Sequence, residues 1–277
     1  MKPSSILILT LFLAAASCTE TPTAILNETQ VVVQAYIYEG APVRDVYVSA
    51  SFAVGSDDSA NTPISTANVV LARLRGTSRE RITLRPIAAK PGYYEVPDST
   101  WFVAVGDSLF LEVKALEHTA TASTAVPRKP EGVAISRREA YVRLETRNTP
   151  FGALTTPRLA DAVQVSWQNP NSEYFYTTLT SIDTARVSLR ADSLNFNFIV
   201  SEPATGTTYD VRDFDIRYTG RYMVNVYRIN KEYADLYKSR SQDSRTLSEP
   251  LTNIRGGLGI FTAFASDTVT FVVRKEE

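Results

Sequence analysis

Few residues of this sequence could act as a nucleophile, a histidine base or a soft metal ligand. The chain has 277 residues, with one cysteine, Cys18, and one histidine, His118. These two residues cannot build a Cys/His zinc site, and a single cysteine forms no disulfide within the chain. They also leave His118 as the only histidine base for a catalytic triad. Because it is isolated from other candidate ligands, we expect His118 to be a surface or edge residue.

Carboxylates are the remaining candidates for catalysis or metal binding. Asp57 and Asp58 could offer oxygens to Ca²⁺, but the spacing and the distal Glu of a calcium loop are absent, so we predict a solvated hairpin tip. Asp210, Asp213 and Asp215 could include the carboxylate pair of a glycosidase, but nothing in the sequence positions two of them. No G-x-S-x-G, H-E-x-x-H or S-x-x-K motif stands out. We predict a protein with no enzymatic activity, cofactor or metal.

The first 17 residues have the pattern of a secretory signal peptide. Lys2 provides a positive charge, and an apolar run of eleven residues extends from Ile6 to Ala16. This run is shorter than the roughly 20 residues of a membrane-spanning helix, so we expect no permanent span. Small residues then lead directly to Cys18.

The position of Cys18 after these small residues resembles the bacterial lipobox, although Ala15 stands where that motif most often has Leu. The resemblance implies cleavage before Cys18 and modification of this cysteine with diacylglyceryl and an N-acyl chain. Several acyl chains on one residue would hold the protein on a bilayer, since each buried methylene contributes about 0.8 kcal/mol. Ordinary secretion with an incidental cysteine is the alternative.

The same segment indicates where the protein is located. We expect residues 1–17 to be a lipoprotein signal peptide and residues 18–30 to be a polar tether between lipid and body. In enteric bacteria an Asp after the lipidated cysteine signals inner-membrane retention, so Thr19 is compatible, by resemblance, with the outer membrane. The expected localisation is the outer membrane, with a lipid anchor. The periplasmic and the extracellular face both stay open.

Charge and composition narrow the range of partners. The chain has 29 Lys and Arg against 30 Asp and Glu, a formal net charge of −1, which argues against a dedicated nucleic-acid binder. Hydrophobic residues make up 44% and charged residues 21%, as in a globular body. We expect contacts with a membrane through the acyl anchor and with an outer-membrane protein, and none with nucleic acid.

Alternating apolar and polar residues predict an all-β body. Strand patterns recur every ~8–15 residues between Gly, Pro, Asn and Asp, which favours sandwiches over a parallel α/β sheet. We predict two tandem Ig-like or fibronectin-III-like β-sandwiches, residues 31–150 and 151–277, joined by a linker at 148–157. One short helix is predicted at Lys231–Arg240, which has one apolar stripe. The main predicted strands are Val31–Tyr38, Arg44–Val54, Ala67–Leu74, Arg79–Leu84, Tyr93–Val96, Ser108–Val113, Thr119–Val126, Ala162–Trp167, Tyr174–Ile182, Asn195–Val200, Phe214–Tyr218, Gly220–Ile229 and Asp267–Arg274.

Aromatic residues of the second half support this fold. A strand ending at Trp167, an Asn-Pro turn and a Tyr-rich strand resemble the fibronectin-III and Ig-like sandwiches, in which an inward Trp packs under the facing sheet. We therefore place Trp167 in the core. Tyr174, Phe175 and Tyr176 are consecutive, so alternation puts at least one of them on the outer face. Such a residue could mark a carbohydrate or protein contact surface, or be an amphipathic Tyr on a half-buried strand.

Two segments resemble sequences of known proteins. Residues 31–126 follow the pattern A-x-V, G-x-Y and G-x-x-Y-x-L-x-V, the last of these without its Tyr. Residues 253–261 read Asn-Ile-Arg-Gly-Gly-Leu-Gly-Ile-Phe. With the lipobox, these segments resemble an uncharacterised Bacteroidetes lipoprotein family, a domain of unknown function. The resemblance implies an outer-membrane lipoprotein with an Ig-like sandwich, often encoded beside TonB-dependent receptors, and no established enzymatic activity.

The glycine-rich run in the second segment permits unusual backbone conformations. Gly256, Gly257 and Gly259 allow a positive φ or a close backbone approach. A phosphate loop would need a following Lys-Ser/Thr and a strand-to-helix context, and both are absent. Two interpretations stay open. The run is either a tight loop that places Phe261 and its apolar neighbours in the core, or a partner-binding loop made of Gly256, Gly257, Gly259 and Phe261.

Together these features favour a non-catalytic, outer-membrane-anchored lipoprotein that acts as a binding or scaffolding partner, with a TonB-dependent transporter as the expected partner. Two alternatives belong to other classes. An Asp/Glu-based glycan hydrolase would have two carboxylates ~5–9 Å apart in a cleft. A carbohydrate-binding surface lipoprotein would have a row of exposed Tyr or Trp on one sheet face.

Overall fold

The structure is a computed structural model. It describes residues 29–51, 62–149, 152–190, 197–240 and 251–276. The predictions for Cys18 and for Asp57 and Asp58 lie outside the described residues. Within the described ranges no helix is long and apolar enough to cross a bilayer.

The described chain is almost entirely β-structure. The strands are β1 (Val31–Tyr38), β2 (Val46–Ala50), β3 (Thr62–Pro63), β4 (Asn68–Arg75), β5 (Ser78–Thr83), β6 (Arg85–Pro86), β7 (Tyr93–Glu95), β8 (Ser108–Ala115), β9 (His118–Ala125), β10 (Glu131–Ile135), β11 (Glu139–Thr149), β12 (Gly152–Leu159), β13 (Val163–Gln168), β14 (Tyr174–Ser181), β15 (Phe198–Val200), β16 (Thr208–Val211), β17 (Gly220–Ile229) and β18 (Leu258–Lys275). The helices are α1 (Lys231–Arg240) and a 3₁₀ turn, η1 (Asp213–Asp215). The predicted all-β fold with one short α-helix is confirmed.

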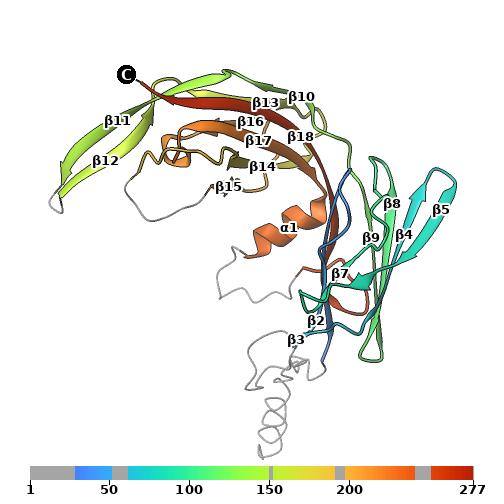
Figure 1. Ribbon diagram of the computed structural model, residues 1–277. Helices are drawn as coiled ribbons and strands as arrows, with labels where there is room; N and C mark the ends of the chain where they lie inside the picture. Colours follow the sequence, from blue (N-terminus) through green and yellow to red (C-terminus); the bar gives the residue numbers. More distant parts are fainter. Residues whose placement is uncertain (1–28, 52–61, 150–151, 191–196, 241–250, 277) are drawn as a thin grey trace, which may run out of the picture.

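Three sheets form two sandwiches. An eleven-stranded sheet, the large sheet, has the order β15-β14-β17-β18-β1-β2-β7-β6, with β11 on β18, β12 on β11 and β3 on β2. A four-stranded sheet, β5-β4-β8-β9, covers one half of it, and a three-stranded sheet, β10-β13-β16, covers the other half. The large sheet bends between the two halves, so the molecule is an arch (Figure 1).

Each sandwich has its own apolar core. The first core lies between β1, β2 and the four-stranded sheet, and includes Val33, Leu71 and Leu109. The second core lies between the large sheet and the three-stranded sheet, around Trp167 and Phe175, whose ring centroids are 5.6 Å apart. Trp167 is buried in this core, as its position before the Asn-Pro turn predicts.

The cores do not follow the expected ranges 31–150 and 151–277. Ala140 and Val142, from β11, pack in the second core, whereas Ile254 and Phe261 pack in the first. The C-terminal segment therefore completes the N-terminal sandwich, and the two sandwiches are interleaved in sequence.

The cause of this interleaving is the long strand β18. Its first part pairs in parallel with β1, from Leu258 beside Val32 to Phe264 beside Tyr38. Its second part pairs antiparallel with β17, and its last residues pair in parallel with β11. One strand of 18 residues thus belongs to both sandwiches and follows the whole bend of the arch (Figure 1).

The concave side of the bend is covered by α1 (Figure 1). Tyr233 of α1 packs edge-on against Phe264, with ring centroids 5.0 Å apart, and Ala234 is fully buried. At the junction before α1, the Asn230 side-chain amide donates hydrogen bonds to the Thr124 hydroxyl at 2.9 Å and to the Ala125 carbonyl at 2.8 Å. The helix therefore contacts the large sheet and is tied through Asn230 to β9 of the first sandwich.

The rings under the helix form the elbow cluster, which we define as Tyr36, Tyr38, Tyr176, Tyr227, Tyr233 and Phe264. Tyr176 stacks on Tyr227 with ring centroids 4.7 Å apart. Burial, followed by the neighbouring Tyr227 and Tyr233, raises the pKa of Tyr38 to about 12. Of the three consecutive aromatic residues of β14, Phe175 faces the second core and Tyr176 faces the elbow cluster. The side chains of β14 thus alternate between the two faces of the sheet, and the face opposite the core is covered by α1.

Two predictions of local structure are wrong. The expected linker at 148–157 is a hairpin instead: β11 and β12 pair antiparallel, with Leu144 opposite Pro157. Pro157 is tolerated because β12 is an edge strand and needs no further N–H donor. The expected strand Phe214–Tyr218 starts in η1, because the carboxylate of Asp215 accepts a hydrogen bond from the Arg212 backbone N–H at 3.0 Å and so closes a turn.

Candidate functional site

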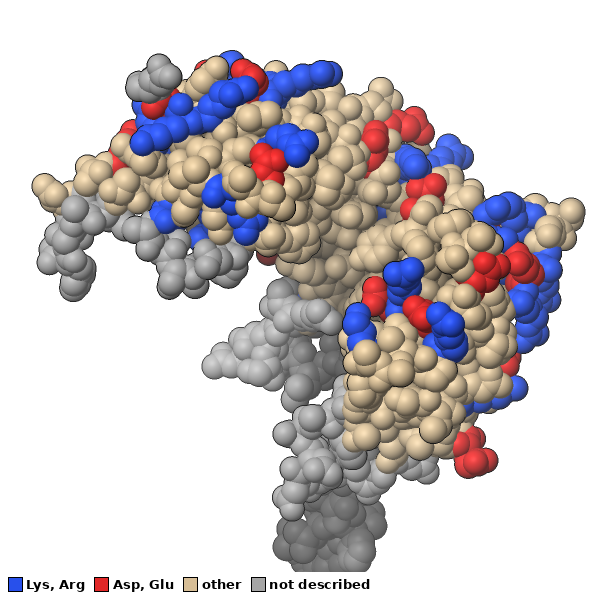
Figure 2. Space-filling model, viewed as in Figure 1, with Lys and Arg blue, Asp and Glu red and all other residues tan. Residues whose placement is uncertain are grey.

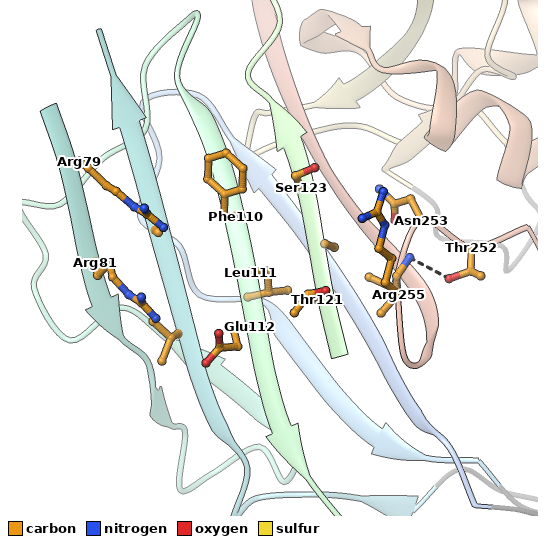
Figure 3. Close-up of a pocket in the computed structure, with 14 residues that line it drawn as sticks. Arg79, Arg81, Phe110, Leu111, Glu112, Thr121, Ser123, Thr252, Asn253 and Arg255 are labelled. Atoms are coloured by element: carbon orange, nitrogen blue, oxygen red, sulfur yellow. Dashed lines mark hydrogen bonds between the residues drawn. The ribbon is translucent and has the colours of Figure 1, made fainter. Parts of the chain in front are cut away.

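The outer face of the four-stranded sheet, opposite the first core, carries a groove of about 650 Å³. Its floor comes from β4, β8 and β9, and its two sides come from β5 and from residues 252–255 (Figure 3). Side chains alternate along β8, so Leu109 and Leu111 enter the core while Phe110 and Glu112 point into the groove. Phe110, in the middle of the groove, is 43% exposed.

Arginines line both sides of this groove. Arg79 and Arg81 project from β5, and Arg255 lies on the opposite side (Figure 3). No carboxylate of the described residues lies within ion-pair distance of these three guanidinium groups. The acidic residue of the lining, Glu112, is 3.2 Å from Lys114 Nζ. The groove therefore has an excess of positive charge in a chain that is nearly neutral overall.

The positive side chains follow from the position of β5 in the fold. The strand pairs only with β4 and forms the edge of its sheet. Charged residues are common on edge strands because they discourage pairing with other chains. Figure 2 shows Lys and Arg side chains gathered at this edge of the first sandwich. Alternation then places Arg79 and Arg81 on the groove side of β5.

The segment before β18 forms the second side of the groove through specific hydrogen bonds. The Asn253 side chain accepts a hydrogen bond from the Phe261 backbone N–H at 2.9 Å and donates one to the Phe261 carbonyl at 2.7 Å. Arg255 exchanges backbone hydrogen bonds of 2.9 and 2.8 Å with Thr121 of β9. Ile254, between them, is buried in the first core. This side of the groove is therefore held by its own backbone and leaves the Arg255 side chain free to face the groove.

Glycines are required where this segment crosses the first sandwich. A Cβ atom on Gly259 would lie 2.0 Å from the Val33 carbonyl oxygen, and one on Gly256 would lie 2.4 Å from the Thr119 carbonyl oxygen. Gly257 makes a similar approach, and both Gly256 and Gly259 have positive φ values, +74° and +109°. The glycine-rich run is thus a place where two backbone segments cross closely. This agrees with the first of the two interpretations of its sequence, a tight loop next to the core.

Phe261 does not fit the partner-binding interpretation of this run. Its side chain has no exposed surface and packs in the first core. In this conformation it offers nothing to a partner. The positions that face solvent beside the run belong to Arg255 and Thr252 instead.

The hairpin end beside the groove is held by an ion pair between a buried carboxylate and a half-exposed arginine. Asp107, with 1% of its surface exposed, accepts hydrogen bonds from Arg75 Nε and Nη2, both at 2.7 Å. It also accepts one from the Ala104 backbone N–H at 2.8 Å. Burial alone would raise the pKa of Asp107, but the Arg75 guanidinium and the Ala104 hydrogen bond outweigh burial and hold this pKa below its ordinary value. The pair fixes the end of β4 against the start of β8.

The remaining candidate residues from the sequence do not form a site. His118 is exposed at the start of β9, as expected for an edge histidine. Asp215 is buried and its carboxylate contacts Arg212 and Tyr209.

Two further carboxylates of this region are also occupied. Asp213 accepts a hydrogen bond from the Leu159 backbone N–H at 2.8 Å, and Asp210 accepts one from the Gln164 amide at 2.7 Å. These carboxylates therefore stabilise local structure. Across the described ranges, no group of three or more His, Cys, Asp or Glu side chains is placed to hold a metal ion.

The sequence alone does not identify the groove residues as a site. The strand patterns place Arg79 and Arg81 on one face of β5, and Phe110 and Glu112 on one face of β8. Finding the groove also requires the strand order β5-β4-β8-β9 and the pairing of Arg255 with Thr121, which join positions far apart in the chain.

The fold and the groove define an all-β protein of Ig-like sandwiches with an open sheet face. Comparison with family models shows the protein family to which this chain belongs. The chain belongs to the family described as "Domain of unknown function (DUF4249)", whose model matches residues 19–270. A search of curated proteins finds no match.

Solved structures with a detectable likeness are multidomain β-sandwich proteins. One is the crystal structure of the FN1–FN3 domains of chicken CNTN1, with 13% identity and a TM-score of 0.29, covering 90% of this chain and 68% of that chain. Another is the crystal structure of titin domains A168–A170, with 10% identity and a TM-score of 0.21, covering 89% of this chain and 66% of that chain.

Proposed function

We propose that this protein is an outer-membrane lipoprotein, anchored through acyl chains on Cys18, that acts as a non-catalytic binding or scaffolding partner of an outer-membrane protein. The signal pattern before Cys18 supports the anchor. The family match, which begins at residue 19, is compatible with a leader that ends at this cysteine. A TonB-dependent transporter is the partner class that the family resemblance implies.

The open groove is the observation that carries the binding role. A sheet face with exposed Phe110 between arginines that have no acidic partner among the described residues has the composition of a protein contact surface, in which aromatic residues and Arg are enriched. An Arg fork also binds carboxylates in a defined geometry. The groove is held on a rigid sheet, so little ordering is needed when a partner binds.

The two alternative functions have less support. A hydrolase needs two carboxylates that face one cleft, whereas the lining of the groove contains only Glu112. In two other depressions that carboxylates line, Glu173, Glu139 and Glu276 are ion-paired with arginines. A carbohydrate-binding face needs aligned exposed rings. Among the described residues, the tyrosines with more than a third of their surface exposed are Tyr38, whose ring packs in the elbow cluster, and Tyr141 on β11, so they form no aligned row.

The anchor is tested by metabolic labelling with an alkyne palmitate in wild-type and Cys18→Ser cells. We expect label on the wild-type chain, no label on the variant, and release of the variant from membranes. An unlabelled wild-type chain, with a Cys18→Ser variant that stays equally membrane-bound, would contradict lipidation.

The partner role is tested by purification from detergent-solubilised outer membranes. We expect one outer-membrane protein, a TonB-dependent transporter, to be enriched with the wild-type chain. The matched control is the Cys18→Ser chain, which should lose this enrichment if the anchor brings both proteins together. Recovery of the wild-type chain alone would count against a scaffolding role.

A further inference from the structure

The register of the four-stranded sheet shows how the groove is laid out. Arg81 lies opposite Ala72, Ala72 lies opposite Phe110, and Phe110 lies opposite Ser123, so these residues form one row across the four strands. The neighbouring row ends at Thr121, which pairs with Arg255. Arg81 thus stands at the β5 end of the first row, and Arg255 stands at the opposite end of the second row.

The width between the two positive sides limits what can bind. From β5 to the segment of Arg255 the rows cross four strand spacings, about 19 Å in all, since neighbouring strands are ~4.8 Å apart. A small anion cannot contact both sides. An α-helix with its side chains is about 10–12 Å across, and the long Arg side chains of the groove span the remaining distance on each side.

The floor between the two sides has an apolar part made of Val70, Ala72 and Phe110. It also contains the carboxylate of Glu112, which is ion-paired with Lys114, and the hydroxyls of Thr121 and Ser123 on β9 (Figure 3). Small side chains on β4 next to the larger Phe110 leave a trough along the strands. An apolar stripe of a ligand would be buried there.

The backbone of the sheet also bears on the conformation of the ligand. The N–H and C=O groups of β4 and β8 are used within the sheet, because each strand is paired on both sides. An extended peptide lying on this face would bury its own backbone groups without partners, at a cost of about 1–3 kcal/mol for each. A helix satisfies these groups internally.

We propose that the groove binds an amphipathic α-helix of a partner protein, with an apolar stripe over Val70, Ala72 and Phe110 and acidic residues on both flanks. This inference rests on the proposed binding function and names the ligand of the same groove. The acidic flanks pair with Arg79 and Arg81 on one side and with Arg255 on the other. The chain provides an internal precedent, since α1 covers the concave face of the large sheet.

The test uses the purified full-length chain and three fluorescent synthetic helices of about 18 residues each. The first has a Leu stripe with Glu flanks, the second has the same stripe with Lys flanks, and the third has Glu flanks and Gln in place of the stripe. The groove variant is Arg79→Glu, Arg81→Glu and Arg255→Glu together. The control variant is Arg44→Glu, Arg128→Glu and Arg138→Glu, three exposed arginines outside the groove with the same change in charge.

We expect the wild-type and control chains to bind the Leu/Glu helix at least about tenfold more tightly than the other two helices. The groove variant should lose this preference and favour the Leu/Lys helix. Equal binding of the Leu/Glu helix by the groove and control variants would overturn the proposal, as would equal binding of all three helices or no saturable binding. Circular dichroism of the variants establishes that they are folded.

A second variant separates the apolar contact from the charges. Phe110→Ser should weaken binding of the Leu/Glu helix and leave binding of the Gln/Glu helix unchanged. Because these measurements need neither membrane nor native partner, their failure would remove the helix-binding groove and leave the labelling and co-purification results as they stand. Failure of those two experiments would remove the proposed function without changing the peptide result.

Discussion

Two sheet faces of this protein lie opposite a core and differ in what covers them. The concave face of the large sheet carries the elbow cluster and is covered by α1, with Tyr233 and Ala234 at the contact. The outer face of the four-stranded sheet carries Phe110 and unpaired arginines and has no covering element among the described residues. The apolar content of the first face is used within the chain, whereas that of the second is available to another molecule.

The difference between the faces also shows in their polar groups. The elbow cluster has phenols, which combine an apolar ring with one hydroxyl and suit a face that is largely covered by the chain itself. The groove has guanidinium groups, which remain charged and hydrated and suit a face that is exposed until a partner arrives. Phenols therefore occur on the face that the chain covers, and guanidinium groups occur on the face that is exposed to solvent.

The largest effect is expected where both faces depend on one residue. Gly259→Ala places a Cβ atom against the Val33 carbonyl at a φ of +109°, so the pairing of β18 with β1 must shift. We expect a loss of stability of about 4 kcal/mol or more, measured by urea unfolding. The matched control is Gly206→Ala, where an added Cβ meets nothing within 4 Å. Equal stability of the two variants would contradict this role of Gly259.

The next experiment compares the same substitution on the two faces. Phe264→Ala removes a fully buried ring from the elbow cluster and should cost about 3–5 kcal/mol. Phe110→Ala removes a half-exposed ring from the groove and should change stability by no more than about 0.5 kcal/mol. Thermal unfolding measures both. A large cost for Phe110→Ala would mean that the groove face is part of the folding core.

A smaller effect is expected for the side of the groove that Asn253 holds. Asn253→Ala removes both side-chain hydrogen bonds to the Phe261 backbone and should cost about 1–3 kcal/mol. It should also weaken binding of the Leu/Glu helix, because Arg255 would lose its fixed position. Unfolding and peptide binding are measured on the same sample. Unchanged binding with reduced stability would show that Arg255 is positioned by Thr121 alone.

The smallest effect is a dependence on alkaline pH that involves only the covered face. The folded pKa of Tyr38 is raised to about 12, from an ordinary value of 10.0, so the neutral phenol is favoured in the folded state. Its contribution to stability is complete below about pH 10 and is lost as the pH rises through about 12. We expect Tyr38→Phe to show a weaker fall in stability over this interval than the wild-type chain. An identical fall in both would contradict this contribution.

Local elements of the fold follow from the sequence where short-range patterns are strong. The predicted bounds of β1, β17 and α1 agree with the structure, because dense β-branched and aromatic runs or a helical stripe define them locally. The sequence patterns do not predict the first half of β18, because this half starts in a glycine-rich segment that has weak strand propensity. Its partner β1 lies at the other end of the chain, and a local pattern carries no information about such a pairing.

The same limit applies to the site. The arginines and Phe110 alternate on their strands as predicted, but the groove exists only because Arg255 is brought beside Thr121 by the close crossing at Gly256. The sequence correctly predicted glycines with a backbone role. It could not predict which carbonyl groups they approach.

The shared strand has a consequence for biogenesis. The core of the N-terminal sandwich contains Ile254, Phe261 and Ala263, so this sandwich remains incomplete until residues 254–263 have been synthesised. The N-terminal sandwich therefore cannot complete its fold before most of the second sandwich has been synthesised. Contacts between sequence ends also make folding slow. The first sandwich therefore reaches its native core only after the strand that it shares with the second sandwich is available.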